Sequence, residues 1–257
     1  MSDVMIVTGG NRGIGAAIAR EAGAGGWHVC VNYRRHGGEA EALAAGIVAG
    51  GGTAIAVQAD VAVEADVVRL FEEADERLGP VTALVNNAGM DIPVAVADVT
   101  KEQLEATFAA NAFGPFLCAR EAVRRMSTAN GGAGGVIVNI SSIAAVYGGM
   151  PGDVIYAGTK AAVDAMTMGL AREVGGQGIR VCGVRPGLVA TDLWTDTHIS
   201  LEQVNRHAQA LVPLGRVGTP QEIAHAVLWL CSEEAGYVTG TLLDVSGGRE
   251  IDVPPAR

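Results

Sequence analysis

Several features that mark particular binding partners are scarce or absent in this chain of 257 residues. Lysine occurs only at Lys101 and Lys160, and basic residues never stand more than two in a row. Phosphate backbones are bound by clusters of basic side chains, so this pattern and the net charge of −10 argue against a nucleic-acid partner. No run of about 18 apolar residues is present, and we therefore expect no membrane-spanning helix.

Cysteine and histidine are few and widely spaced. The four cysteines form no C-x-x-C pair, and the five histidines show no spacing typical of a metal site. Residues 1–8 combine a short apolar run with no basic start, which is unlike a secretory leader. We expect a cytoplasmic protein with reduced thiols, no metal and no membrane attachment.

What is present is typical of a folded domain, with 49% apolar and 18% charged residues. Short runs rich in Val and Ile alternate with longer Ala-rich amphipathic stretches. The runs predicted as strands are 4–8, 28–33, 53–57, 82–86, 135–141, 179–184 and 241–245. The stretches predicted as helices are 13–23, 38–50, 63–78, 101–126, 153–174, 201–210 and 220–231. This alternation predicts one α/β domain over 1–257, a doubly wound Rossmann-type fold with a seven-stranded parallel sheet and helices on both faces.

A glycine-rich turn follows the first predicted strand and opens the first predicted helix. Glycines at such a junction let the backbone approach a pyrophosphate, which the helix N-terminus stabilises. The spacing Gly9-x-x-x-Gly13-x-Gly15 differs from the common G-x-G-x-x-G fingerprint, so a plain tight turn is the alternative. Its position directly after the first strand favours a dinucleotide site. The residues predicted to form that site are Gly9, Asn11, Arg12, Gly13, Ile14 and Gly15.

The end of the second predicted strand indicates which dinucleotide is bound. An NAD-selective site places an acidic residue there to hold the ribose 2′-hydroxyl. This chain has Tyr33, Arg34 and Arg35 instead, and the first acid is Glu39. Arg34 or Arg35, together with Arg12, can meet a 2′-phosphate through charge-assisted hydrogen bonds. We therefore predict NADP(H) as the preferred cofactor, with NAD(H) possible; the alternative is that the arginines merely cap a surface turn.

Polar residues also follow the third and fourth predicted strands. Asp60 and Val61 come after the third, where a carboxylate can accept from an adenine amino group or form an ordinary turn. Asn86 and Asn87 close the fourth, followed by Ala88 and Gly89. Amides at the end of a buried strand need partners, so we expect them to tie neighbouring strands together or to face the cofactor.

Tyr156 and Lys160 lie four residues apart near the start of a predicted helix, so both face the same way. A phenol with a pKa near 10 is a poor acid or base at neutral pH, but an ammonium nearby stabilises the phenolate. The phenol can then exchange a proton with a carbonyl or alcohol oxygen while a nicotinamide exchanges the hydride. The alternative is a half-buried tyrosine with its hydroxyl in solvent.

Polar residues in two further segments are candidates for the same region. Ser141 and Ser142 end the fifth predicted strand, where a hydroxyl can bond the reacting oxygen or form a turn. Asn111 stands inside an apolar helical stretch, where a polar side chain is out of place. It can act in the site, or it can bond backbone or water.

These motifs, in this order, resemble those of the short-chain dehydrogenase/reductase family, in its compact subclass of roughly 250 residues. The resemblance covers almost the whole chain and adds Pro186-Gly187-x-x-x-Thr191 and Thr239-Gly240 to the motifs above. It implies that Ser142 is the catalytic hydroxyl, Tyr156 the general acid/base, and Lys160 the group that lowers its pKa and binds the nicotinamide ribose. Asn111 would hold a water that relays protons, and Val189 and Thr191 would meet the carboxamide.

The resemblance implies an NADP(H)-dependent reductase of ketones or aldehydes, of the 3-oxoacyl or general carbonyl type. A sugar or polyol dehydrogenase similar to glucose-1-dehydrogenase is the alternative, and a non-catalytic dinucleotide sensor is a third. The family places a substrate lid at 188–212, which here contains Leu193, Trp194, His198 and His207. It also suggests a homotetramer with interfaces on 101–126 and 153–174.

Overall fold

Seven parallel strands form the sheet of the computed structural model, which describes residues 3–191 and 201–249. The strands are β1 (Val4–Val7), β2 (His28–Tyr33), β3 (Thr53–Gln58), β4 (Val81–Asn86), β5 (Gly135–Ile140), β6 (Ile179–Pro186) and β7 (Leu242–Val245). Their order across the sheet is β3-β2-β1-β4-β5-β6-β7, and every neighbouring pair is parallel. The predicted fold class is therefore confirmed.

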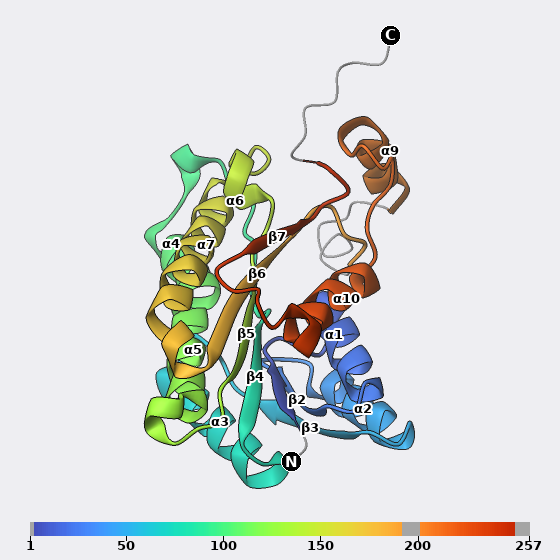
Figure 1. Ribbon diagram of the computed structural model, residues 1–257. Coiled ribbons are helices and arrows are strands. Elements are labelled where there is room, and N and C mark those ends of the chain that lie inside the picture. The colour runs from blue at the N-terminus through green and yellow to red at the C-terminus, as the bar shows by residue number, and fades with distance from the viewer. Residues whose placement is uncertain (1–2, 192–200, 250–257) are drawn as a thin grey trace.

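Helices cover the sheet on both faces because each strand in its centre is apolar on both sides (Figure 1). The main helices are α1 (Gly13–Ala24), α2 (Gly37–Ala49), α3 (Glu64–Leu78), α4 (Lys101–Phe108), α5 (Gly114–Met126), α7 (Val154–Val174), α9 (Leu201–Leu211) and α10 (Pro220–Cys231). One hydrophobic core joins α1, α2 and α10 to the sheet. A second core joins α3, α5 and α7 to the opposite face.

The strand order reverses beside β1, because β2 extends the sheet on one side and β4 on the other. In open parallel sheets a crevice forms at such a switch point, outside the carboxyl ends of the strands. The short helix α6 (Ala144–Tyr147) and α9 stand at this end of the sheet, opposite the N-terminus (Figure 1). The fold thus places the ends of β1, β2, β4 and β5 around one crevice.

The predicted helix 101–126 is not regular throughout. A π-helical turn over Ala109–Phe113 separates α4 from α5. Such a turn contains an extra residue, and π-turns of this kind are frequent at functional sites. Here it holds Asn111, fully buried, in contact with groups outside its own helix. The polar residue in the apolar stretch therefore marks the irregularity that the helical prediction missed.

The described residues contain no helix long and apolar enough to cross a membrane. They also hold no cluster of three or more His, Cys, Asp or Glu side chains arranged to bind a metal ion. All four cysteines are buried free thiols, and burial raises the pKa of Cys30 and Cys118 to about 12. These thiols are packing groups of the core at neutral pH.

Candidate active site

The glycine-rich turn lies between β1 and α1 and depends on backbone that glycine adopts readily. Gly9 and Gly13 have φ angles of +59° and +54°, in the left-handed region. A side chain at Gly15 would place its Cβ 2.4 Å from the Gly9 carbonyl oxygen and 2.5 Å from Asn87 Nδ2. Helix α1 therefore starts directly after the glycine-rich turn. Its N-cap residue is Arg12, whose side chain makes no capping hydrogen bond to the first N–H groups of the helix.

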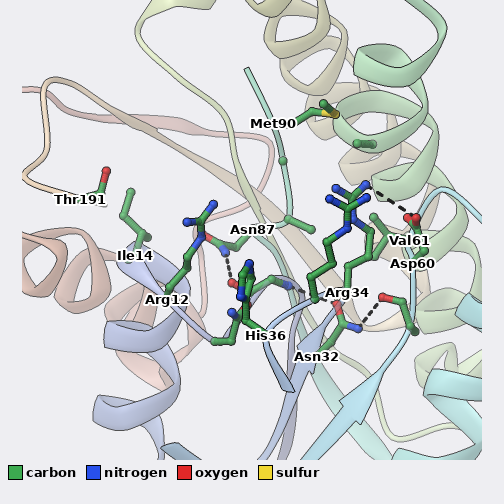
Figure 2. A pocket seen from close by; sticks show the side chains of 18 residues that line it. Arg12, Ile14, Asn32, Arg34, His36, Asp60, Val61, Asn87, Met90 and Thr191 are labelled. Carbon is green, nitrogen blue, oxygen red and sulfur yellow. Dashed lines mark hydrogen bonds and ion pairs between the residues drawn. The ribbon is translucent and has the colours of Figure 1, made fainter. Parts of the chain in front are cut away.

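A cavity of about 370 Å³ opens above this turn (Figure 2). Thirteen predicted cofactor residues line it: Gly9, Asn11, Arg12, Gly13, Ile14, Arg34, Arg35, Asp60, Val61, Asn87, Ala88, Gly89 and Thr191. Five residues that the sequence reasoning missed line it as well: Asn32, His36, Ala59, Met90 and Ala110. Residues from four strand ends thus share one cavity, and it has room for much of a dinucleotide.

Asn32 ties the carboxyl ends of three strands together. Its Oδ1 accepts from the Gly9 backbone N–H at 3.2 Å, and its Nδ2 donates to the Ala59 carbonyl at 3.0 Å. The Gly10 N–H also donates to the Asn32 carbonyl, at 2.7 Å. A buried amide inside the apolar strand β2 is the signal that points to this role, just as it does for Asn86.

The basic residues after β2 face the carboxylate after β3. Arg34 Nη1 lies 3.7 Å from Asp60 Oδ2, and both side chains are partly exposed to solvent (Figure 2). Asp60 Oδ1 accepts from the Ala62 N–H at 3.0 Å, which is ordinary turn chemistry. Arg34 therefore lines the cavity and forms only an exposed, weak ion pair with Asp60. Such a pair costs little to break, so the guanidinium is available to bind a phosphate.

Thr8 and the two asparagines at the end of β4, Asn86 and Asn87, connect the two halves of the crevice. Asn87 Nδ2 donates to the Thr8 and Gly9 carbonyls at 2.9 and 3.0 Å, and its N–H donates to Thr8 Oγ1 at 2.9 Å. Asn86 Nδ2 donates to Asn139 Oδ1 on β5 at 2.9 Å. Of the two predicted alternatives, the structure shows that these amides tie neighbouring strands together, and Asn87 lines the cavity as well.

The four predicted catalytic residues come together beside this cavity. A Cβ on Gly89, which lines the cavity, would lie 3.3 Å from Asn111 Oδ1 and 3.6 Å from Lys160 Nζ. Lys160 Nζ donates to the Ile140 carbonyl at 2.8 Å and lies 5.7 Å from the centre of the Tyr156 ring. The Ser142 side chain is near enough to the Tyr156 hydroxyl to lower its pKa.

Comparison with known proteins identifies this arrangement. A family model described as enoyl-(acyl carrier protein) reductase matches residues 9–250. The chain is 42% identical to the oxidoreductase YgfF of Escherichia coli over 96% of this chain and 99% of that protein. The chain belongs to the short-chain dehydrogenase/reductase family. It is an oxidoreductase of that family, as the sequence motifs predict.

Further relatives of this short-chain dehydrogenase/reductase are similar along almost their whole length. Versicolorin reductase 1 of Dothistroma septosporum is 37% identical over 95% of each chain. A short-chain dehydrogenase from Burkholderia cenocepacia, solved in complex with NADP, shares 33% of its sequence with a TM-score of 0.88. That comparison covers 96% of this chain and 98% of the other.

In this short-chain dehydrogenase/reductase, burial sets the pKa values of the Tyr–Lys pair. Burial raises the pKa of Tyr156 to about 12, partly offset by the hydrogen bond with Ser142. Burial lowers the pKa of Lys160 to about 8, against the charge of Asp164, which raises it. Burial is the largest cause of the raised pKa of Tyr156, and Lys160 Nζ lies 5.7 Å from the centre of the Tyr156 ring. That Lys160 lowers the pKa of this phenol in the reaction stays a prediction.

The structure distinguishes the two serines after β5. Ser141 is buried, and its hydroxyl donates to the Lys160 carbonyl at 3.2 Å. Ser142 is partly exposed, and its hydroxyl accepts a hydrogen bond from the Ala144 N–H at 3.1 Å. The same side chain lowers the pKa of Tyr156. Ser142 is thus the hydroxyl that faces the site, and Ser141 anchors the helix that carries Lys160.

Seven residues predicted to bind the cofactor do not line the cavity: Gly15, Tyr33, Tyr156, Lys160, Pro186, Gly187 and Val189. The Tyr33 ring packs instead on the start of α2, against Gly37. A Cβ on Gly187 would fall 2.7 Å from the Ser246 backbone, so this glycine permits a close crossing of two chain segments. Of the predicted lid, Leu193, Trp194 and His198 fall outside the described residues, as does the side chain of His207.

Proposed function

We propose that the protein reduces a ketone or aldehyde to an alcohol with NADPH, as a carbonyl or 3-oxoacyl reductase. One observation carries the proposal. The side chains of Asn111 and Lys160 both lie next to Gly89, which forms part of the cavity wall, and Ser142 and Tyr156 lie beside them. Reductases and an NADP complex among the similar proteins support it.

The residues around the cavity fit a dinucleotide. The start of α1 presents backbone N–H groups beside glycines, where a pyrophosphate is stabilised by the helix dipole. A Cβ on Gly9 would lie 3.0 Å from the Ala88 Cα, so the absence of a side chain keeps this passage open. Arg12, Arg34 and Arg35 supply positive charge at the end where a 2′-phosphate would lie.

The reaction proposed here divides the work between the cofactor and the side chains. When bound, NADPH supplies the hydride to the carbonyl carbon. The Tyr156 hydroxyl, which is neutral at physiological pH, donates its proton to the carbonyl oxygen, and Ser142 holds that oxygen by a second hydrogen bond. Lys160 carries its charge at neutral pH and stabilises the phenolate that the proton transfer leaves.

Asn111 has a positioning role in this proposal. Its Oδ1 accepts from the Met90 N–H and its Nδ2 donates to the Met90 carbonyl, both at 2.8 Å. Nδ2 also donates to Thr159 Oγ1 at 3.1 Å, on the helix of Tyr156 and Lys160. The amide thereby fixes the loop after β4 against α7, and with it the wall between the cavity and the reacting groups.

The first experiment measures cofactor binding and carbonyl reduction together. NADPH and NADH are titrated side by side by thermal shift and fluorescence, and NADPH oxidation is followed with a panel of ketones and aldehydes. We expect tighter binding of NADPH and turnover of at least one carbonyl compound. Binding of NADPH without turnover of any carbonyl compound, or of an alcohol with NADP⁺, would contradict the proposed reaction.

We also propose that the described parts of the predicted lid, residues 188–191 and 201–212, border the substrate side. Thr191 lines the cavity, and α9 stands beyond the carboxyl ends of the strands (Figure 1). The isolated bridge between Val189 and Gly218 holds the start of this segment against the chain before α10.

We further propose a homotetramer with interfaces on 101–126, which spans α4, the π-turn and α5, and on 153–174, which contains α7. Phe113 at the end of the π-turn and Phe116 on α5 are 59% and 52% exposed, and patches of this kind mark interaction sites. Replacing both with Asp is expected to lower the mass in solution from about four chains to one or two, because buried charges oppose association. Light scattering after gel filtration measures this. The control is Val48→Asp on α2, 52% exposed and outside the proposed interface, and a monomeric unsubstituted protein would overturn the proposal.

A further inference from the structure

A histidine in the lining of the cofactor cavity has no part in the proposed reaction. His36 follows Arg34 and Arg35 after β2, and all three residues line the cavity (Figure 2). The His36 side chain is exposed to solvent, and it makes no hydrogen bond or ion pair with the described residues. The imidazole is therefore open to a ligand in the cavity.

The backbone of the turn after β2 fixes the position of this histidine. His36 has a φ angle of 61°, and it is the one non-glycine residue with a positive φ in the described parts of the chain. Left-handed backbone is uncommon outside glycine but more frequent for histidine, asparagine and aspartate. Gln58 Nε2 donates to the Arg34 carbonyl at 3.2 Å, and the Glu39 N–H donates to the His36 carbonyl at 3.1 Å. The turn is thus held on both sides, while the ring itself has no such contact.

A hydrogen bond joins this turn to the glycine-rich turn. Asn11 Nδ2 donates to Glu39 Oε2 at 3.0 Å, one helical turn after His36. Arg12 follows Asn11 and lines the same cavity. In the view of Figure 2 the His36 side chain lies between those of Arg12 and Arg34. Basic groups from two segments of the chain therefore line one cavity together with His36.

Positive charge predominates in the lining of this cavity. Three arginines line it beside His36, and Asp60 is the one carboxylate among the described residues that do so. Asp60 lies 3.7 Å from Arg34, and the carboxylate of Glu39 is hydrogen-bonded by the glycine-rich turn. Arginines stay cationic and carboxylates stay anionic between pH 6.5 and 8.5. Histidine is the side chain that changes its charge in this range, so His36 adds a positive charge that depends on pH.

We propose that His36 binds the 2′-phosphate of NADPH as the imidazolium, so that the preference for NADPH over NADH grows as the pH falls from 8.5 to 6.5. A phosphate monoester carries close to two negative charges above its second pKa of about 6. It favours the charged form of a neighbouring imidazole, and the charge-assisted hydrogen bond is stronger than a neutral one. The gain in affinity is therefore present at the acidic end of the range and is lost as the ring loses its proton. The inference rests on the proposed use of NADPH and adds a pH-dependent ligand to that site.

Proton uptake on binding tests this assignment directly. The full chain is titrated by calorimetry with NADPH and with NADH at pH 7.0, in two buffers that differ in their enthalpy of ionisation. We expect uptake of about half a proton with each NADPH and none with NADH, because only the phosphate favours the charged ring. Loss of a proton from the 2′-phosphate would have the opposite sign. Release of protons, or no exchange, would contradict the role of His36.

Dissociation constants at several pH values give a second measure. The affinity for NADPH relative to NADH is expected to rise about three- to tenfold from pH 8.5 to pH 6.5. In His36→Asn both this rise and the proton uptake are expected to disappear, while the affinity for NADH is unchanged. Asparagine also adopts left-handed backbone readily, so the substitution keeps the turn.

His225 provides a matched control. It is an exposed histidine on α10 that does not line the cavity. Asparagine and histidine have similar helix propensities, so His225→Asn costs little stability. This variant is expected to keep both the proton uptake and the rise in relative affinity. Loss of either in His225→Asn would assign the titrating group to a residue other than His36.

The outcomes separate this inference from the proposed function. If the protein prefers NADPH to the same degree at pH 6.5 and 8.5, or if His36→Asn still takes up the proton, His36 is not the pH-dependent ligand and the use of NADPH stands. If the unsubstituted protein binds NADPH no better than NADH at any pH, the proposed cofactor preference and the role of His36 are overturned together.

Discussion

Replacing Tyr156 with Phe is expected to lower kcat/KM for ketone reduction by about 10³-fold. The phenol is the proposed proton donor, and the substitution removes its oxygen while keeping the ring that packs beneath Lys160. The affinity for NADPH is expected to change by less than about threefold, because the cavity is lined by other residues. Steady-state rates and a fluorescence titration with NADPH measure the two effects separately.

Tyr237 provides a control of the same chemistry. Its side chain is fully exposed, so Tyr237→Phe removes a hydroxyl that contacts only solvent and is expected to leave both quantities unchanged. If Tyr156→Phe kept the turnover of the unsubstituted protein, the assignment of Tyr156 as general acid would be wrong. If instead it lost NADPH affinity in proportion to turnover, the hydroxyl would serve binding rather than proton transfer.

Arg34→Ala is expected to weaken the binding of NADPH by about 10- to 100-fold and that of NADH by less than about twofold. The two cofactors differ by the 2′-phosphate alone, and Arg34 lines the cavity in an exposed ion pair with Asp60. Without a phosphate the guanidinium has little to bind, whereas with one it forms charge-assisted hydrogen bonds. Titration of each cofactor at a fixed ionic strength measures the difference.

Arg77 is a closely matched control for this substitution. Its side chain is 48% exposed against 46% for Arg34, and each guanidinium lies 3.7 Å from one carboxylate. Arg77 is on α3, away from the cavity lining, so Arg77→Ala is expected to alter neither affinity. If Arg34→Ala lowered the affinities for NADPH and NADH equally, Arg34 would not bind the 2′-phosphate. Arg12 and Arg35 would then be the remaining candidates for that role.

The sequence alone determined the elements and their class. Runs of Val and Ile with no polar face predict strands that are buried on both sides. The structure places all seven of these strands in one parallel sheet. The glycine turn and the spacing of Tyr156 and Lys160 are equally local, since helix geometry alone puts residues four apart on one face. Motifs of this kind were sufficient to identify the family.

The fine arrangement of the site was decided by contacts between distant parts of the chain. Asn111 bonds Met90, 21 residues before it, and Thr159, 48 residues after it, and the π-turn that allows this has no simple periodicity. Sequence reasoning therefore predicted one regular helix there.

The same reason explains the other differences. Tyr33 follows its strand as the binding pattern requires, but the ring packs on α2 because Gly37 leaves space for it. Asn32 gains its role from the loops beside it in space, through its bonds to Gly9 and Ala59. Local spacing fixes which way a side chain leaves its own element, so the sequence determined the fold, the family and the proposed reacting groups. Only tertiary packing decides which distant groups contact that side chain, and so it alone placed Asn111 between Met90 and Thr159.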